Sequence, residues 1–396
     1  MRELSRSGVG RAFLARAVVV TLVTAAGLIA LWPGGVDPKL SEVFGGETEV
    51  AEVTGIEEFA CEGAVSDVCQ NLTVVLKRGR HEGIEAEIRN LGGSGGPVPP
   101  GLDVEDEIRV AEVVQPPGAT GPPEFTVTDF ERRSPMLWLA IAFAALVIAF
   151  GRLRGALSLL GLAISLAIVL VFVVPAILDG SDPLWVAIFG ALAVMLATIS
   201  LAHGLGAKSI AAIAGTTASL ALVAVLAKLF TEATSLTGLS SEEAGTLVFN
   251  GVVSQPSLEG LLLAGMVIGA LGVLDDVTVS QASTVLALRR VNPALSFGQL
   301  YSRAIEVGRD HVSATVNTLV LAYVGASLPV LLVLTSSEFG LIEGINLELV
   351  AKEVVAMLVG SIGLIAAVPL TTALTSALAV RSRPDDLGAP PADHGH

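Results

Sequence analysis

Long apolar runs recur along this chain, and their length constrains the fold more than any other feature. A helix needs about 20 residues to cross the hydrocarbon core of a bilayer. Eight runs, the first two rather short, approach or exceed this length: Ala17–Trp32, Met136–Phe150, Ala156–Leu178, Leu184–Ala202, Ile210–Phe230, Leu258–Leu274, Ser313–Thr335 and Val354–Val380. With 52% hydrophobic and only 15% charged residues, the 396-residue chain is too apolar for an ordinary soluble protein. The sequence therefore predicts an α-helical polytopic membrane bundle of about eight transmembrane helices in a lipid bilayer.

Basic residues predict how the runs are oriented, because Lys and Arg concentrate in cytoplasmic loops. If eight spans alternate, one large group of basic residues falls on a single side: Arg2, Arg6, Arg11, Arg16, Arg152, Arg154, Lys208, Arg289, Arg290, Arg303, Arg309, Arg381 and Arg383. The opposite connections are mainly acidic: Asp179, Asp182, Glu232, Glu242, Glu243, Glu338, Glu343 and Glu348. Both termini are therefore expected in the cytoplasm.

The sequence also predicts how the membrane region and the two ends of the chain are organised. Residues 1–33 read as an N-terminal transmembrane anchor, and a cleaved signal peptide is the alternative, because the start is basic. The sequence around Trp32 and Pro33 is a poor cleavage site for a signal peptidase, which favours the anchor. Residues 134–382 form the expected seven-helix transmembrane domain, and residues 383–396 are predicted to be a disordered cytoplasmic tail.

Residues 34–133 differ in character from the rest of the chain. They carry 20 acidic and 8 basic residues, a balance of −12. An acidic surface argues against nucleic acid as a partner. It either keeps an extracytoplasmic domain soluble, the preferred interpretation, or concentrates cations near the membrane.

Short alternating segments indicate that this outer domain is rich in β-strands. Four segments have strand character: Leu72–Lys77, Ile84–Arg89, Ile108–Val113 and Phe125–Val127. Clusters of Pro and Gly at 92–101 and 116–123 mark turns or linkers between them. Several short strands separated by turns favour a small barrel or sandwich, and an OB-like barrel is preferred.

The only two cysteines, Cys61 and Cys69, both lie in the outer domain. An oxidising compartment makes a disulfide between them the favoured interpretation. Two cysteines alone are not a metal site, and His81, the only nearby imidazole, is expected to be a surface residue.

Two adjacent aspartates, Asp275 and Asp276, are the only charged residues between Glu259 and Arg289. Ionisable groups at membrane depth are costly and usually line a pathway or bind a ligand. The stretch from Leu258 to Leu288 would measure about 45 Å as one helix. Either a tilted helix carries both aspartates into the membrane, or the span ends near Leu274 and the chain returns as a re-entrant or interfacial segment.

Hydroxyl and amide side chains follow the aspartates at helical spacing. Asp276, Ser280, Ser283 and Thr284 share one helical face, and Gln281 lies beside them. Carboxylate, hydroxyl and amide oxygens suit a proton, Na⁺, Mg²⁺ or Ca²⁺ better than a soft metal. The segment is therefore a candidate site for a bound cation, with no other cofactor expected.

A second polar cluster opens the next apolar run and contains Arg309, Asp310, His311 and Asn317. Its residues are expected on the same cytoplasmic side as the aspartates, so the two clusters can meet. Arg309 or His311 is then placed to neutralise Asp276. Such a pair would complete a transport site, or it would be a buried ion pair that only fixes how the helices pack.

Two long motifs in these segments resemble the YibE/F family of bacterial multi-pass membrane proteins. The first runs from Gly269 through Asp275-Asp276 to Thr284, and the second from Gly308 through Arg309-Asp310-His311 to Pro329. The resemblance extends from about Glu49 to Val380. It implies a location in the bacterial cytoplasmic membrane and implies no particular substrate or reaction.

These patterns lead to two main functional hypotheses. The first is an ion-coupled transporter or channel-like permease for a small ion or solute, although no internal repeat is evident. The second is a non-transporting assembly or sensor protein whose outer domain binds a partner, and a homo-oligomer or a membrane partner fits both. No hydrolase, transferase or nucleotide-binding motif is present, so an enzyme is not expected, and a metal-dependent membrane enzyme using Asp275 and Asp276 ranks third.

Overall fold

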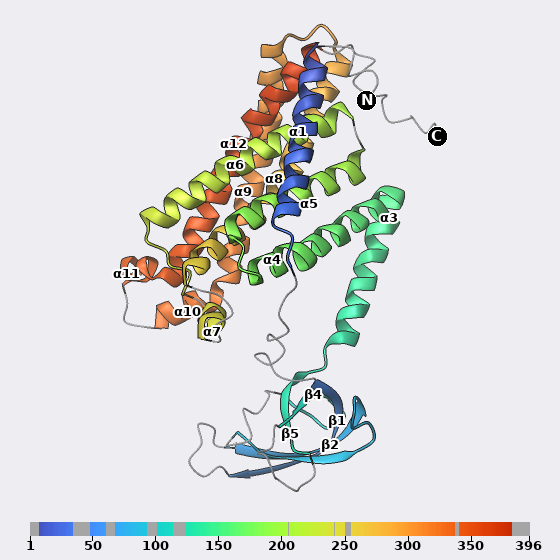
Figure 1. Ribbon diagram of the computed structural model, residues 1–396, viewed down its shortest axis with the longest axis vertical. Coiled ribbons are helices and arrows are strands. Elements are labelled where there is room, and N and C mark those ends of the chain that lie inside the picture. Colours follow the sequence, from blue (N-terminus) through green and yellow to red (C-terminus); the bar gives the residue numbers. More distant parts are fainter. Residues whose placement is uncertain are drawn as a thin grey trace. The chain divides into compact units, whose positions relative to one another are not determined.

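The computed structural model in Figure 1 describes residues 8–34, 48–60, 68–92, 101–113, 123–204, 206–240, 242–249, 255–336 and 340–381. The chain divides into two compact units. One contains Met1–Val36 and Val147–His396, and the other contains Asp37–Leu146. The predicted tail after residue 382 lies outside the described residues.

The smaller unit is built on an antiparallel five-stranded sheet with the order β3-β2-β1-β4-β5. The strands are β1 Thr48–Ala60, β2 Val68–Arg78, β3 Glu85–Leu91, β4 Glu107–Glu112 and β5 Phe125–Phe130. Alternate apolar residues such as Val53, Leu72, Val74, Ile88 and Ile108 are buried and form its core. Four strands were predicted from their alternation, while closure into an OB-like barrel is not confirmed.

The central strand β1 escaped prediction. It pairs with β2 on one side and β4 on the other, yet its sequence is rich in Glu and its alternation is interrupted. The register shifts between Val50 and Ala51 and again between Val53 and Gly55. Such irregularities add a residue to one strand and break the two-residue periodicity on which strand prediction depends.

His81, which was expected to be a surface residue, is partly exposed and pairs with Glu49. Its Nδ1 atom lies 2.8 Å from Glu49 Oε1, and its backbone N–H donates to Glu49 Oε2 at 3.0 Å. The imidazole also meets the ring of Phe125 edge-on. Burial raises the pKa of Glu49, but the bonds from His81 outweigh burial and hold that pKa below its usual value.

Cys69 is buried on β2 and is disulfide-bonded. Cys61, the other cysteine of the chain, lies outside the described residues.

The larger unit is helical. Its elements, together with α3, which begins in the smaller unit, are α1 Gly8–Ala30, α3 Arg133–Ile168, η2 Val169–Val173, α4 Val174–Leu178, α5 Pro183–His203, α6 Ala207–Ala233, α7 Glu242–Phe249, α8 Gln255–Val291, α9 Phe297–Ala326, α10 Leu328–Ser336, α11 Leu341–Asn346 and α12 Glu348–Arg381. Within the described residues, six helical segments are long and apolar enough to cross a membrane, or seven if the bent pair α9 and α10 counts as one span. The prediction of about eight spans is not confirmed.

Two departures from regular helix explain the difference in count. The run from Arg133 to Leu178 is counted as one segment of 46 residues, but its backbone leaves the helical conformation at Arg152 (φ 51°, ψ −132°). The pair α9 and α10 is bent by 60°, and Pro329 follows the break. Proline cannot donate to the helical hydrogen-bond ladder, which accounts for a bend at this place.

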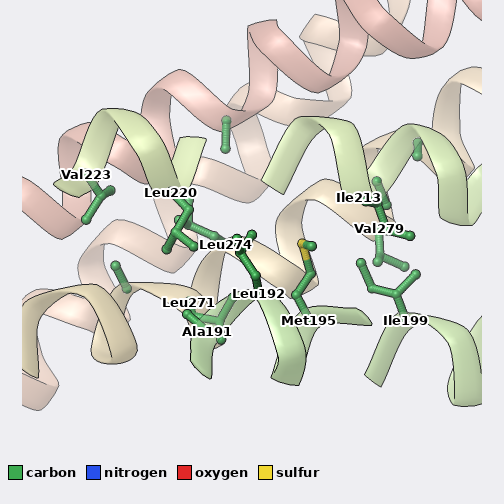
Figure 2. Packing of buried hydrophobic residues seen from close by; sticks show 14 of the residues in the cluster. Ala191, Leu192, Met195, Ile199, Ile213, Leu220, Val223, Leu271, Leu274 and Val279 are labelled. Atoms are coloured by element: carbon green, nitrogen blue, oxygen red, sulfur yellow. The ribbon is translucent and has the colours of Figure 1, made fainter. Parts of the chain in front are cut away.

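Helices α5, α6, α8 and α12 pack together at the centre of this unit, and Figure 1 shows them side by side. Figure 2 shows their contact, where Met195 and Leu192 of α5 meet Leu220 of α6 and Leu274 of α8. These side chains are almost completely buried. Close packing of small and branched side chains is how helices associate in a bilayer, where lipid supplies no hydrophobic driving force between them.

Helix α8 is continuous from Gln255 to Val291, a length of about 55 Å. The chain therefore does not turn back after Leu274, as a re-entrant segment would require. Asp275 lies 17 residues after Leu258, about 26 Å along the axis. Both aspartates are consequently carried within the helical bundle and do not lie in a loop.

Candidate functional site

Asp275 is the best-enclosed charged group of the predicted site. The Thr198 hydroxyl on α5 donates to Asp275 Oδ2 at 2.9 Å. Asp275 Oδ1 is buried and has no hydrogen-bond partner in the described part of the chain. A buried carboxylate oxygen normally accepts at least one bond, so this oxygen is available to a ligand.

The Thr198 hydroxyl has other acceptors within reach. It lies 3.0 Å from the carbonyl oxygen of Val194 and 3.2 Å from that of Met195, one turn earlier in α5. A hydroxyl carries a single hydrogen, so the carboxylate and these carbonyls compete for one donor.

A cavity of about 270 Å³ lies against Asp275 and Asp276. Its walls come from α3, α5 and α8, and its other polar side chains are Ser158, Ser165 and Thr198. Asp276 is exposed in this cavity, while Asp275 is partly covered. This volume is several times the roughly 30 Å³ that one water molecule occupies in the liquid, so the cavity has room for a hydrated ion.

No basic residue in the described part of the chain neutralises the aspartates. Among the described residues, neither Asp275 nor Asp276 forms a salt bridge with Lys, Arg or His. The structure does not bring Arg309 or His311 into an ion pair with Asp276. The interpretation of the aspartates as half of a buried structural ion pair therefore finds no support in the described part of the bundle.

The remaining predicted residues of α8 have other partners. Gln281 is buried, and its Nε2 atom donates to the carbonyl oxygen of Ala304 at 2.8 Å and to Thr372 Oγ1 at 2.7 Å. It thus ties α8 to α9 and α12. Ser283 and Thr284 donate to carbonyls of their own helix one turn earlier.

The two predicted clusters meet at one point. Ser280 Oγ on α8 lies 3.4 Å from His311 Nδ1 on α9. The other predicted members of the α9 cluster, Arg309, Asp310 and Asn317, are exposed and do not line the aspartate cavity.

Three hydroxyl residues of the cavity, Ser158, Ser165 and Thr198, escaped prediction. They belong to α3 and α5, far from the aspartates in sequence. Ser158, Gly161 and Ser165 recur at three- and four-residue spacing in an apolar run, so their shared face could have been noticed. The pairing of Thr198 with Asp275 spans 77 residues and has no signal in a single sequence.

The donors present suit a proton or a hard cation. Among the described residues, no group of three or more His, Cys, Asp or Glu side chains could hold a metal ion. Two carboxylates and three hydroxyls around the cavity nevertheless offer oxygen ligands of the kind that Na⁺, Mg²⁺ and Ca²⁺ prefer.

Comparison with known proteins agrees with the motifs that contain these residues. No curated protein and no solved structure matches the chain. The family model of YibE/F-like proteins matches residues 139–381, which include every described residue of the aspartate cavity and leave out the β-sheet. Because the match covers more than half of its length, the chain belongs to the YibE/F-like protein family.

Proposed function

We propose that this multi-pass membrane protein is an ion-coupled transporter or channel-like permease whose cation or proton site is centred on Asp275. The observation that carries the proposal is the buried, unpartnered Oδ1 atom of Asp275 at the wall of a polar cavity.

Electrostatics supports this function. A carboxylate taken out of water is costly unless a positive charge or hydrogen bonds compensate it. Thr198 supplies one hydrogen bond, and no described basic side chain supplies a charge. A proton or a cation from the cavity would provide the missing compensation, and its arrival and departure would couple the site to an ion gradient.

The two aspartates have different roles in this proposal. Asp275 holds the ion together with Thr198, because it is the better enclosed and its free oxygen is buried. Asp276 is exposed at the same cavity and attracts cations toward it. Sequence spacing had favoured Asp276, because that residue shares a face with Ser280, Ser283 and Thr284. Two of those three, Ser283 and Thr284, instead bond to their own helix.

The proposed membrane topology has eight spans. The break at Arg152 divides the 46-residue run into two segments, and the bent pair α9 and α10 forms one span. Arg152 and Arg154 then mark a cytoplasmic turn, both termini are cytoplasmic, and the protein resides in a bacterial cytoplasmic membrane. No enzymatic activity is proposed.

The first experiment is ion flux in proteoliposomes. Asp275→Asn removes the charge and keeps the size of the side chain, so we expect it to abolish flux driven by a proton or Na⁺ gradient. Asp310→Asn is the matched control, because Asp310 is exposed on α9 and does not line the cavity. The proposal fails if Asp275→Asn transports as well as the wild type.

A second candidate function is a non-transporting assembly or sensor protein. It is favoured by one observation: Asp37–Leu146 form a compact unit with a core of their own, which a simple permease does not need. Deleting residues 49–128 from the full chain should then abolish function in the cell, while Asp275→Asn leaves it intact. Normal function of the deletion variant would rule this candidate out.

A further inference from the structure

A second cavity, of about 310 Å³, lies beside the first half of α8. It contains the ionisable side chains of Tyr323 on α9 and of Lys352 and Glu353 on α12. Lys352 Nζ lies 4.0 Å from Glu353 Oε1, and these side chains are 17% and 35% exposed. Ser240 Oγ, in the wall of the same cavity, is buried without a hydrogen-bond partner in the described residues.

One face of α8 connects this cavity with the aspartate cavity. Gly265 lines the second cavity, and Gly272 and Asp276 line the first. Together with Gly269 these residues fall at i, i+4, i+7 and i+11, on a single helical face. All four are exposed, while Val267, Ala270 and Leu274 on other faces are buried.

The glycines leave this face open. A Cβ atom built on Gly265 or Gly272 meets no described atom within 4 Å. One built on Gly269 meets only the Tyr323 hydroxyl oxygen, at 3.7 Å. Gly265 and Asp276 are 11 residues apart, about 16 Å along the helix, so the open face bridges the distance between the cavities.

Lipid is a poor occupant for this face. A lipid-facing stripe would place the Asp276 carboxylate toward hydrocarbon, at a cost of about 2.5–3.5 kcal/mol or more at the centre of a bilayer. Water in contact with both cavities would solvate that carboxylate and the charged pair of Lys352 and Glu353.

We infer that the two cavities are the ends of one hydrated path along the glycine face of α8, and that Glu353 is a second binding site for a small cation at the end opposite Asp275. The identity of the ligand as a cation rests on the proposed function, whereas the hydration of the path does not. A cation that reaches Glu353 competes with Lys352 for the carboxylate, and Tyr323 forms the constriction at Gly269.

Thiol labelling tests the path without relying on transport. A water-soluble methanethiosulfonate reagent modifies only thiols that ionise in water, so Gly269→Cys in a water-filled path should react on the order of tenfold faster or more than a thiol facing lipid. Leu321→Cys is the matched control, because Leu321 lies on the exposed surface of α9, two residues from Tyr323. Gly272→Cys serves as a second probe, and the unmodified chain measures the background labelling.

Three results would overturn the path: equal labelling of Gly269→Cys and Leu321→Cys, failure of both glycine positions to react, or spontaneous disulfide formation between Gly269→Cys copies. The last would show that a second copy covers the face.

Flux measurements then separate the two proposals. Glu353→Gln should slow flux. Glu306→Gln is the control and should leave flux unchanged, because Glu306 is exposed on α9. Labelling of Gly269→Cys without any flux in the wild type would refute transport and keep the path. Flux without labelling of Gly269→Cys would refute the hydrated path. Full flux in Glu353→Gln would refute the second cation site. In both cases the proposal of transport would stand.

Discussion

Single residues account for the chemistry of the bundle, and they show that similar side chains in one segment have different functions. Asp275 offers a free oxygen to a cavity, while Gln281, six residues later, has its amide nitrogen bonded to two other helices. Gln281 is so tightly held that a Cβ atom on Gly308 of α9 would lie only 2.9 Å from its Oε1 atom. We therefore interpret Gln281 as a packing residue and exclude it from the ion site.

At the same scale, the pair of Glu49 and His81 predicts a pH dependence for the β-sheet. The pKa of Glu49 is lowered in the folded protein, because the bonds from His81 outweigh its burial. The ionised Glu49 carboxylate therefore stabilises the folded sheet fully above about pH 4.3, the pKa of Glu in the unfolded chain. This stabilisation is lost as the pH falls through the lower pKa that Glu49 has in the folded protein.

Glu49→Gln in the full-length protein tests this sign. At neutral pH we expect β1 amides to exchange hydrogen roughly tenfold faster, because a bond to a charged group contributes about 1.5 kcal/mol. The difference from wild type should shrink below pH 4. Glu87→Gln is the control, because the ion pair of Glu87 with Arg89 is exposed and should change exchange little. A difference that persists unchanged at acidic pH would contradict the assignment.

Elements differ in how far their sequences determine them. The apolar runs predicted the membrane helices well, because length and hydropathy are local properties that a single sequence displays. Their ends were predicted less well: α8 begins near the expected residue but continues to Val291, 17 residues past the expected end. Strand β1 was missed, because its two register shifts disguise the alternation that identified its neighbours.

The break in α3 gives a prediction about topology. If Arg152 lies in a cytoplasmic turn between two spans, Arg152→Cys should be labelled by an impermeant thiol reagent from the cytoplasmic side in inverted vesicles. It should not be labelled from the outside in intact cells. If the 46-residue run is one span, the same thiol is buried in the membrane and reacts from neither side.

The control for this prediction is Leu166→Cys, 14 residues further along α3, outside the aspartate cavity and within the segment that both topologies place in the membrane. Labelling of Arg152→Cys from the outside would reverse the proposed orientation of the chain.

At the scale of the whole molecule, the sequence predicted a membrane bundle joined to a β-rich unit, and both are present. The aspartate segment could be singled out from the sequence, since two charges in a long uncharged stretch are visible without a structure, and its function as a site stays a prediction. Its environment was not predictable. The cavity walls come from α3 and α5, and which helices adjoin α8 depends on long-range packing that periodicity does not encode. For the same reason, the sequence could only suggest that Arg309 or His311 neutralises Asp276, whereas His311 lies beside Ser280.

The shared hydrogen of Thr198 has a consequence for how the bundle could accept a proton. When Asp275 is ionised, the hydroxyl donates to the carboxylate. If a proton binds to Oδ2, the carboxylic acid becomes the donor, and the threonine hydrogen rotates to the carbonyl of Val194, which is already 3.0 Å away. The bond reverses direction without a movement of heavy atoms, so protonation at Oδ2 requires a hydroxyl rotation and no repacking of α5 against α8, while a proton on the free Oδ1 leaves the bond as it is.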